Sequence, residues 1–133
     1  MIELLLDTNI CIYIIKKKPL SVINKLQSLD VADIGISSIT LSELEYGVSK
    51  STQPEKNKLA LTKFLAPIQI ASYDDMAAEK YGDIRAALEK SGKTIGPLDI
   101  LIAAHALSLG CILVTNNTKE FERIKSLKIE NWV

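Results

Sequence analysis

The chain has 133 residues, of which 47% are hydrophobic and 24% charged. This composition is typical of one folded domain and excludes a disordered, highly charged chain, so we expect residues 1–133 to form a single domain. Sixteen basic and sixteen acidic residues cancel, so overall charge gives no sign of a nucleic-acid-binding protein, and any such binding must depend on a local arrangement of charge.

In chain order, short apolar runs alternate with helical patterns. Strands are predicted at residues 2–6, 34–37, 68–71 and 111–114, with a last one near residue 129. Helices are predicted at residues 10–18, 21–29, 38–48, 58–65, 74–90 and 97–110, with a helical turn near 119–124. Residues 50–57 are polar and contain Pro54, which predicts a loop. The alternation predicts an α/β protein, with a parallel sheet covered by helices on both faces.

The cysteines and the apolar stretches favour a cytoplasmic protein. Cys11 and Cys111 each stand alone in an apolar run, so we interpret them as buried free thiols rather than as a disulfide or a metal pair. The first residues lack the features of a signal peptide. The longest mostly apolar stretch, residues 100–114, is shorter than the ~20 residues that a bilayer requires, so no membrane association is expected.

Three acids are predicted to meet at one edge of the sheet. Asp7 directly follows the first strand, and Glu43 lies in the first turns of the helix after the second strand. Asp99 lies in the first turn of the helix before the fourth strand, and residues 116–117, both Asn, follow that strand. Because ligands of open α/β sheets bind beyond the carboxyl ends of the strands, we expect these side chains to converge there.

Each acid also has a purely structural explanation. Asp7 can cap the helix that follows it, and Glu43 can complete a capping box with Thr40. Asp99 can complement the positive end of its own helix. The single histidine, His105, lies on an apolar helical face and is interpreted as structural. The functional interpretation therefore depends on the three acids acting together.

Carboxylates gathered in one place repel one another unless a cation joins them. Mg²⁺ and Mn²⁺ prefer oxygen ligands, and the sequence has no histidine cluster or thiol pair suited to a softer metal. A cation held by carboxylates can acidify water and neutralise phosphate oxygens, so a phosphodiester is the expected substrate. No glycine-rich Walker loop is present, so nucleotide hydrolysis is not expected.

Several motifs follow one another in a fixed order along almost the whole chain. They are LDTN at residues 6–9, SITLSELEYG at 38–47, IGPLD and IAAHA within 95–106, LVTNNTKEF at 113–121 and ENW at 130–132. Together they resemble the PIN-domain nucleases and, within them, the VapC toxins of bacterial toxin–antitoxin pairs. The resemblance implies a three-layer α/β/α sandwich, a single PIN domain, and an endoribonuclease that depends on Mg²⁺ or Mn²⁺.

The resemblance also assigns roles to individual residues. Asp7, Glu43 and Asp99 match the metal-binding acids of the family. Asn117 stands where many members have a fourth acid, which puts a second ion in doubt. We expect Asn117 to assist catalysis, with Glu120 as a conceivable substitute for the missing acid.

Further implications concern the supporting residues, the substrate and the partners. Thr8, Asn9 and Thr115 are expected to support the site. The chain is most similar to the enteric-type VapC toxins, which implies cleavage of initiator tRNA in the anticodon region. The implied partner is a VapB-type antitoxin whose C-terminal segment lies over the active site. Apolar positions on the first two helices exceed what one sheet face needs, which favours a homodimer or an antitoxin-binding groove.

Two alternative functions remain open from the sequence alone. One is a PIN-like module that binds RNA or protein without catalysis, because Asn117 replaces an acid. The other is a receiver-like signalling domain, although such a domain needs an acidic pair after the first strand, where this chain has the single acid Asp7.

Overall fold

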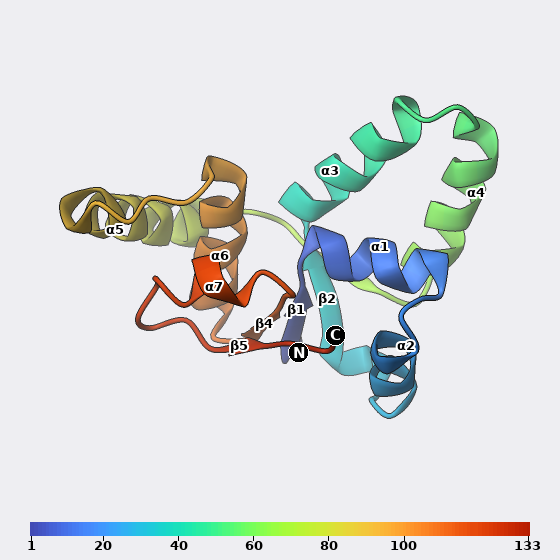
Figure 1. Cartoon of the computed structure of the whole chain (residues 1–133), viewed down its shortest axis with the longest axis horizontal. Helices are drawn as coiled ribbons and strands as arrows, with labels where there is room; N and C mark the ends of the chain where they lie inside the picture. The colour runs from blue at the N-terminus through green and yellow to red at the C-terminus, as the bar shows by residue number, and fades with distance from the viewer.

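The computed structural model describes residues 1–133 and contains one five-stranded sheet between two layers of helices (Figure 1). The strands are β1 (Leu4–Leu6), β2 (Ile34–Ser37), β3 (Gln69–Ala71), β4 (Ile112–Val114) and β5 (Ile129–Glu130). All are parallel, in the order β3-β2-β1-β4-β5. The predicted α/β class and three-layer arrangement are confirmed.

Seven α-helices cover the sheet. They are α1 (Thr8–Lys16), α2 (Leu20–Gln27), α3 (Ser38–Ser49), α4 (Pro54–Leu65), α5 (Asp75–Ser91), α6 (Pro97–Leu109) and α7 (Thr118–Phe121). Helices α1 to α4 lie on one side of the sheet and α5 to α7 on the other (Figure 1). No helix is both long and apolar enough to cross a bilayer.

Alternation of side chains along the central strands builds a separate core on each face. Leu5 of β1 pairs with Leu113 of β4, and both are buried in the core beneath α5, α6 and α7. The next pair, Leu6 and Val114, is buried in the core beneath α1 to α4. Because successive strand residues point to opposite faces, these apolar runs supply both cores at once.

Two local predictions are wrong. Helix α4 begins at Pro54, inside the segment predicted to be a loop, because proline suits the first helical position, where no backbone donor is needed. Thr40 does not cap a helix, since α3 already begins at Ser38 and its N-cap is Ser37, whose hydroxyl accepts the N–H of Ile39 at 3.0 Å. The capping box proposed for Thr40 and Glu43 is therefore absent.

Candidate active site

The carboxyl ends of β1, β2 and β4 lie side by side and end in buried polar residues. These are Asp7, Ser37 and Thr115. The Asp7 N–H donates to the carbonyl of Val114 at 3.0 Å, which joins the ends of β1 and β4. The sheet thus presents polar side chains at the edge where the sequence predicts ligand binding.

Asp7 is a buried carboxylate that caps a helix. It caps α1, with its carboxylate accepting the Ile10 N–H at 3.0 Å, and it is only 6% exposed. Burial raises the pKa of this carboxyl, and the negative charge of Glu43 raises it further, while the nearby Thr115 hydroxyl and the Ile10 N–H oppose the rise. Asp7 is therefore a well-oriented carboxylate in a place that does not favour its charge.

Glu43 is held by a hydrogen bond from another element. The Thr8 hydroxyl, at the start of α1, donates to Oε1 of Glu43 on α3 at 2.7 Å. Thr8 directly follows Asp7 in the sequence. Two neighbouring residues at the start of α1 therefore supply one acid, Asp7, and orient another, Glu43. The hydrogen bond orients Glu43, and the supporting role of Thr8 stays a prediction.

Asp99 lies in the first turn of α6 and is half-buried. Its pKa is raised to about 6, first by burial and then by the negative charges of Glu120, Asp7 and Glu43. Three other acids are therefore close enough to influence the Asp99 carboxyl. We call Asp7, Glu43, Asp99 and Glu120 the acid cluster.

The acid cluster suits a hard divalent cation in its donor chemistry. Every donor is a carboxylate oxygen, and the repulsion that raises the pKa of Asp99 is of the kind that a cation removes. No three His, Cys, Asp or Glu side chains are already arranged around one point as a metal site would be. The fit to a cation thus depends on donor chemistry and shared charge rather than on a preformed geometry.

The residues predicted around the fourth position differ in what they contribute. Glu120, on α7, is the charge that affects Asp99 most. Asn117 contributes its backbone N–H, which donates to the Thr115 hydroxyl at 2.9 Å, and its side chain does not cap α7. Asn9 is exposed on α1. Glu120 is therefore a fourth acidic side chain near Asp99, and the role predicted for Asn117 stays a prediction.

Two polar features near the site were not predicted from the sequence. The hydroxyl of Thr40, one helical turn before Glu43, is buried and has no hydrogen-bond partner. Nδ1 of His105 lies 2.8 Å from the Ser37 hydroxyl, and both side chains are buried. The available signals were the serine at a strand end and the lone histidine of the IAAHA motif, but neither identifies its partner.

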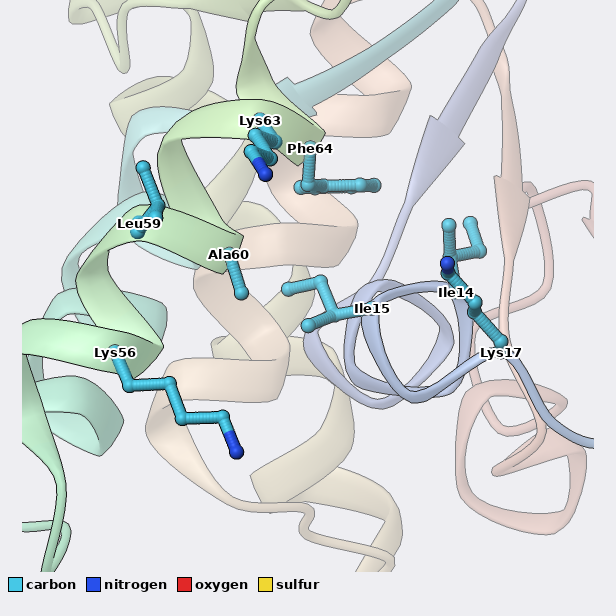
Figure 2. A pocket seen from close by; sticks show the side chains of 8 residues that line it. All are labelled: Ile14, Ile15, Lys17, Lys56, Leu59, Ala60, Lys63 and Phe64. Atoms are coloured by element: carbon cyan, nitrogen blue, oxygen red, sulfur yellow. The ribbon is translucent and has the colours of Figure 1, made fainter.

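An apolar groove with a basic rim leads away from the acid cluster. One part, of about 520 Å³, lies between α1 and α4, where Ile15 points toward Ala60 (Figure 2). A second part, of about 410 Å³, shares these two residues and extends to Glu43 on α3. The lysines along the two parts are Lys16, Lys17, Lys50, Lys56 and Lys63. We call this feature the lysine-rimmed groove.

Comparisons with known proteins agree with this architecture. The model of the PIN domain family matches residues 4–127, a span that includes every member of the acid cluster. The chain is 48% identical to the tRNA(fMet)-specific endonuclease VapC of Shigella flexneri, over 99% of each chain.

Solved structures give the same result. The structure of DNA-bound VapBC from Salmonella typhimurium matches with a TM-score of 0.94 and 45% identity, covering 100% of both chains. That of VapBC2 from Rickettsia felis, bound to a DNA fragment from its promoter, matches with a TM-score of 0.92 and 46% identity, again over 100% of both chains.

Proposed function

The chain belongs to the PIN-domain family, in its VapC group, and from this premise we propose that it is the toxin of a toxin–antitoxin pair. In this proposal it is an endoribonuclease that requires Mg²⁺ or Mn²⁺ and cleaves initiator tRNA in the anticodon region. The catalytic part is carried by the gathering of acids from four separate segments at one end of the sheet. The Thr8 hydroxyl, next to Asp7, donates to Glu43 at 2.7 Å, and the negative charges of Glu120, Asp7 and Glu43 all raise the pKa of Asp99. The specificity follows the relative from Shigella flexneri, whose name gives tRNA(fMet) as its substrate.

Three carboxylates would hold the cation, namely those of Asp7, Glu43 and Asp99, with Glu120 beside them. A bound divalent ion supplies neutralisation of phosphate charge and acidification of water. We propose one ion only, held by the three acids that match the metal-binding acids of the family, with Glu120 influencing it through Asp99.

The chain itself supplies orientation and charge. The Ile10 N–H orients the carboxylate of Asp7, and the Thr8 hydroxyl orients that of Glu43, before any ligand arrives. Asp99 has a pKa of about 6 and is partly protonated near neutral pH until positive charge reaches it. The acid cluster therefore attracts a cation, and through it a phosphate, into a chain of zero net charge.

The partner we propose is a VapB-type antitoxin bound in the lysine-rimmed groove. The two matched structures contain VapBC complexes. The groove has an apolar floor that includes Ile15 and Phe64, and basic side chains such as Lys56 along its edge. An amphipathic segment with acidic residues would complement it and would reach Glu43 at its far end. We also propose a homodimer, for which the exposed Met76 and Leu98 offer apolar surface.

The two alternative functions are affected differently by these findings. Membership of the PIN-domain family removes the receiver-like signalling domain. A PIN module without catalysis remains the competing outcome and predicts RNA binding without cleavage.

The test is incubation of the purified chain with total tRNA in Mg²⁺, in Mn²⁺ and in EDTA, in parallel with the variant Asp7→Asn. Asparagine caps a helix about as well as aspartate, so the fold should be retained while a negative charge is lost. We expect initiator tRNA to be cut only by the unaltered chain and only with a divalent ion. Cleavage in EDTA, or by Asp7→Asn, would contradict the mechanism, and intact initiator tRNA beside other cut tRNAs would remove the substrate assignment.

A further inference from the structure

His105 makes a buried hydrogen bond that joins two distant parts of the chain. It lies in the second half of α6 and is 1% exposed, and its Nδ1 lies 2.8 Å from the hydroxyl of Ser37, the last residue of β2. The two residues are 68 positions apart in the sequence. We refer to them as the Ser37–His105 pair.

A second hydrogen bond of Ser37 bears on which atom donates in this contact. The Ser37 hydroxyl already accepts the Ile39 N–H at 3.0 Å, which caps α3. A hydroxyl has one hydrogen to donate, and the nearby neutral imidazole nitrogen can accept it. Burial lowers the pKa of His105, which agrees with a neutral ring. We therefore assign Ser37 Oγ–H as the donor and Nδ1 of His105 as the acceptor, so that the Ser37 hydroxyl accepts one hydrogen bond and donates another.

A second contact fixes the imidazole ring from the neighbouring strand end. The ring of Tyr73, two residues after β3, meets the His105 ring edge-on, with centroids 5.5 Å apart and planes at 78°. The backbone N–H of Tyr73 donates to the hydroxyl of Ser38, the first residue of α3, at 3.0 Å. The ring is thus held between α6, the end of β2 and the segment after β3, which makes it a fixed point rather than a mobile side chain.

The two helices joined by this pair carry opposite sides of the acid cluster. Helix α3 begins directly after Ser37 and carries Glu43, while α6 carries Asp99, six residues before His105. The Ser37–His105 pair is the only side-chain hydrogen bond that links α6 to β2 or α3. This contact therefore ties the start of α3, which carries Glu43, to the helix that carries Asp99.

We propose that His105 is a positioning residue, which accepts the Ser37 hydroxyl at Nδ1 and so keeps Glu43 and Asp99 within reach of a shared cation. This inference rests on the proposed function, because it concerns the same acids. It differs from a purely structural role in one respect: the binding of a divalent ion should depend on the acceptor at the Nδ1 position and not only on filling the cavity.

Two substitutions separate these roles. His105→Asn keeps a hydrogen-bond acceptor at the branch position of Nδ1, whereas His105→Leu keeps apolar volume and removes the acceptor. Mn²⁺ affinity is measured by calorimetry on the RNA-free chain, kcat and KM are measured with tRNA, and circular dichroism identifies variants folded at the assay temperature. We expect His105→Leu to weaken Mn²⁺ binding and lower kcat by about ten- to a hundredfold, as for residues that orient metal ligands, with KM unchanged within about twofold. His105→Asn should restore most of both values.

Three results would overturn the proposal. They are unchanged Mn²⁺ affinity in folded His105→Leu, equal losses in the Leu and Asn variants, and a change in KM alone. If His105→Leu does not fold, Ser37→Gly provides the second test, because it removes the donor, leaves the ring and places a residue that is tolerated at the N-cap of α3. Ser37→Gly should then show the same loss of Mn²⁺ affinity, and a wild-type affinity would refute the proposal. Failure of the proposed function is distinguishable, since the unaltered chain would then bind no Mn²⁺ and cut no tRNA.

Discussion

The two sides of the acid cluster are built in different ways. Asp7 and Glu43, on the side of α1 and α3, each accept a hydrogen bond of 3.0 Å or less, from the Ile10 N–H and the Thr8 hydroxyl. Asp99, on the side of α6, has a pKa of about 6, and every influence on that pKa acts to raise it. One side is thus oriented before any ligand binds, while the other accumulates repulsion. The comparison teaches that orientation and attraction for a cation come from different elements of the fold.

The largest effect is expected from removing the repelled acid. Asp99→Asn should lower tRNA cleavage by about a hundredfold or more, because it deletes a charge proposed to act directly at the cation. Single-turnover cleavage measures this. Asp83→Asn, at an exposed position of α5, is the matched control and should cleave at the normal rate. Equal rates in both variants would show that the α6 side is not part of the site.

The same variant should change the pH dependence of stability in the metal-free chain. The pKa of Asp99 is raised from 3.8 to about 6, so the folded state holds this proton more tightly than the unfolded state. The contribution of Asp99 to stability is therefore full below about pH 4 and is lost as the pH rises through 6. Thermal melts should show Asp99→Asn gaining stability relative to the unaltered chain between pH 4 and 7. A constant difference across this range would argue against the raised pKa.

Loosening the oriented side should have a smaller effect on activity. Thr8→Val removes the hydroxyl that holds Glu43 at nearly constant volume, and we expect about a ten- to hundredfold loss of Mg²⁺ affinity and activity. Thr62→Val, which alters an exposed hydroxyl that bonds only to the backbone of α4, is the control. If the two variants behave alike in a Mg²⁺ titration of cleavage, Glu43 needs no support from Thr8.

Substitutions of Glu120 and Asn117 should lower the cleavage activity to different extents. Glu120→Gln removes the charge that affects Asp99 most and should lower activity by about tenfold, a value typical of a partner of a metal ligand. Asn117→Ala removes an amide that makes no cap and should change activity less than Glu120→Gln. Cleavage rates in the reverse order would restore Asn117 as the assisting residue.

The smallest effect concerns stability alone. The Thr40 hydroxyl is buried without a partner, and Thr40→Val replaces it with a methyl group of similar size. We expect a gain of about 1 kcal/mol in the free energy of unfolding, because the cost of burying an unpaired hydroxyl disappears. Urea denaturation measures this gain. A loss of stability would indicate that the hydroxyl has a partner, such as water, in solution.

The sequence predicted the layered fold because that fold follows from short-range patterns, while the shared site of Asp7, Glu43 and Asp99 stays a prediction. The apolar strands, the helical spacing and the acids after strand ends can be read within a few residues. The capping role of Ser37 was missed because Thr40, followed three residues later by Glu43, also fits the sequence of a capping box. The proximity of Glu120 to Asp99 and the pairing of His105 with Ser37 depend on how helices pack, so no local pattern contains them.

The most direct test of the central claim is calorimetric titration of Mn²⁺ into the RNA-free chain at pH 6, in two buffers that differ in ionisation enthalpy. If the acid cluster shares one cation, a single ion should bind and release protons, since Asp99, with a pKa of about 6, is partly protonated there. Asp99→Asn should bind the ion more weakly and release fewer protons. Identical binding and proton release in the two proteins would contradict the claim that these acids hold one ion together.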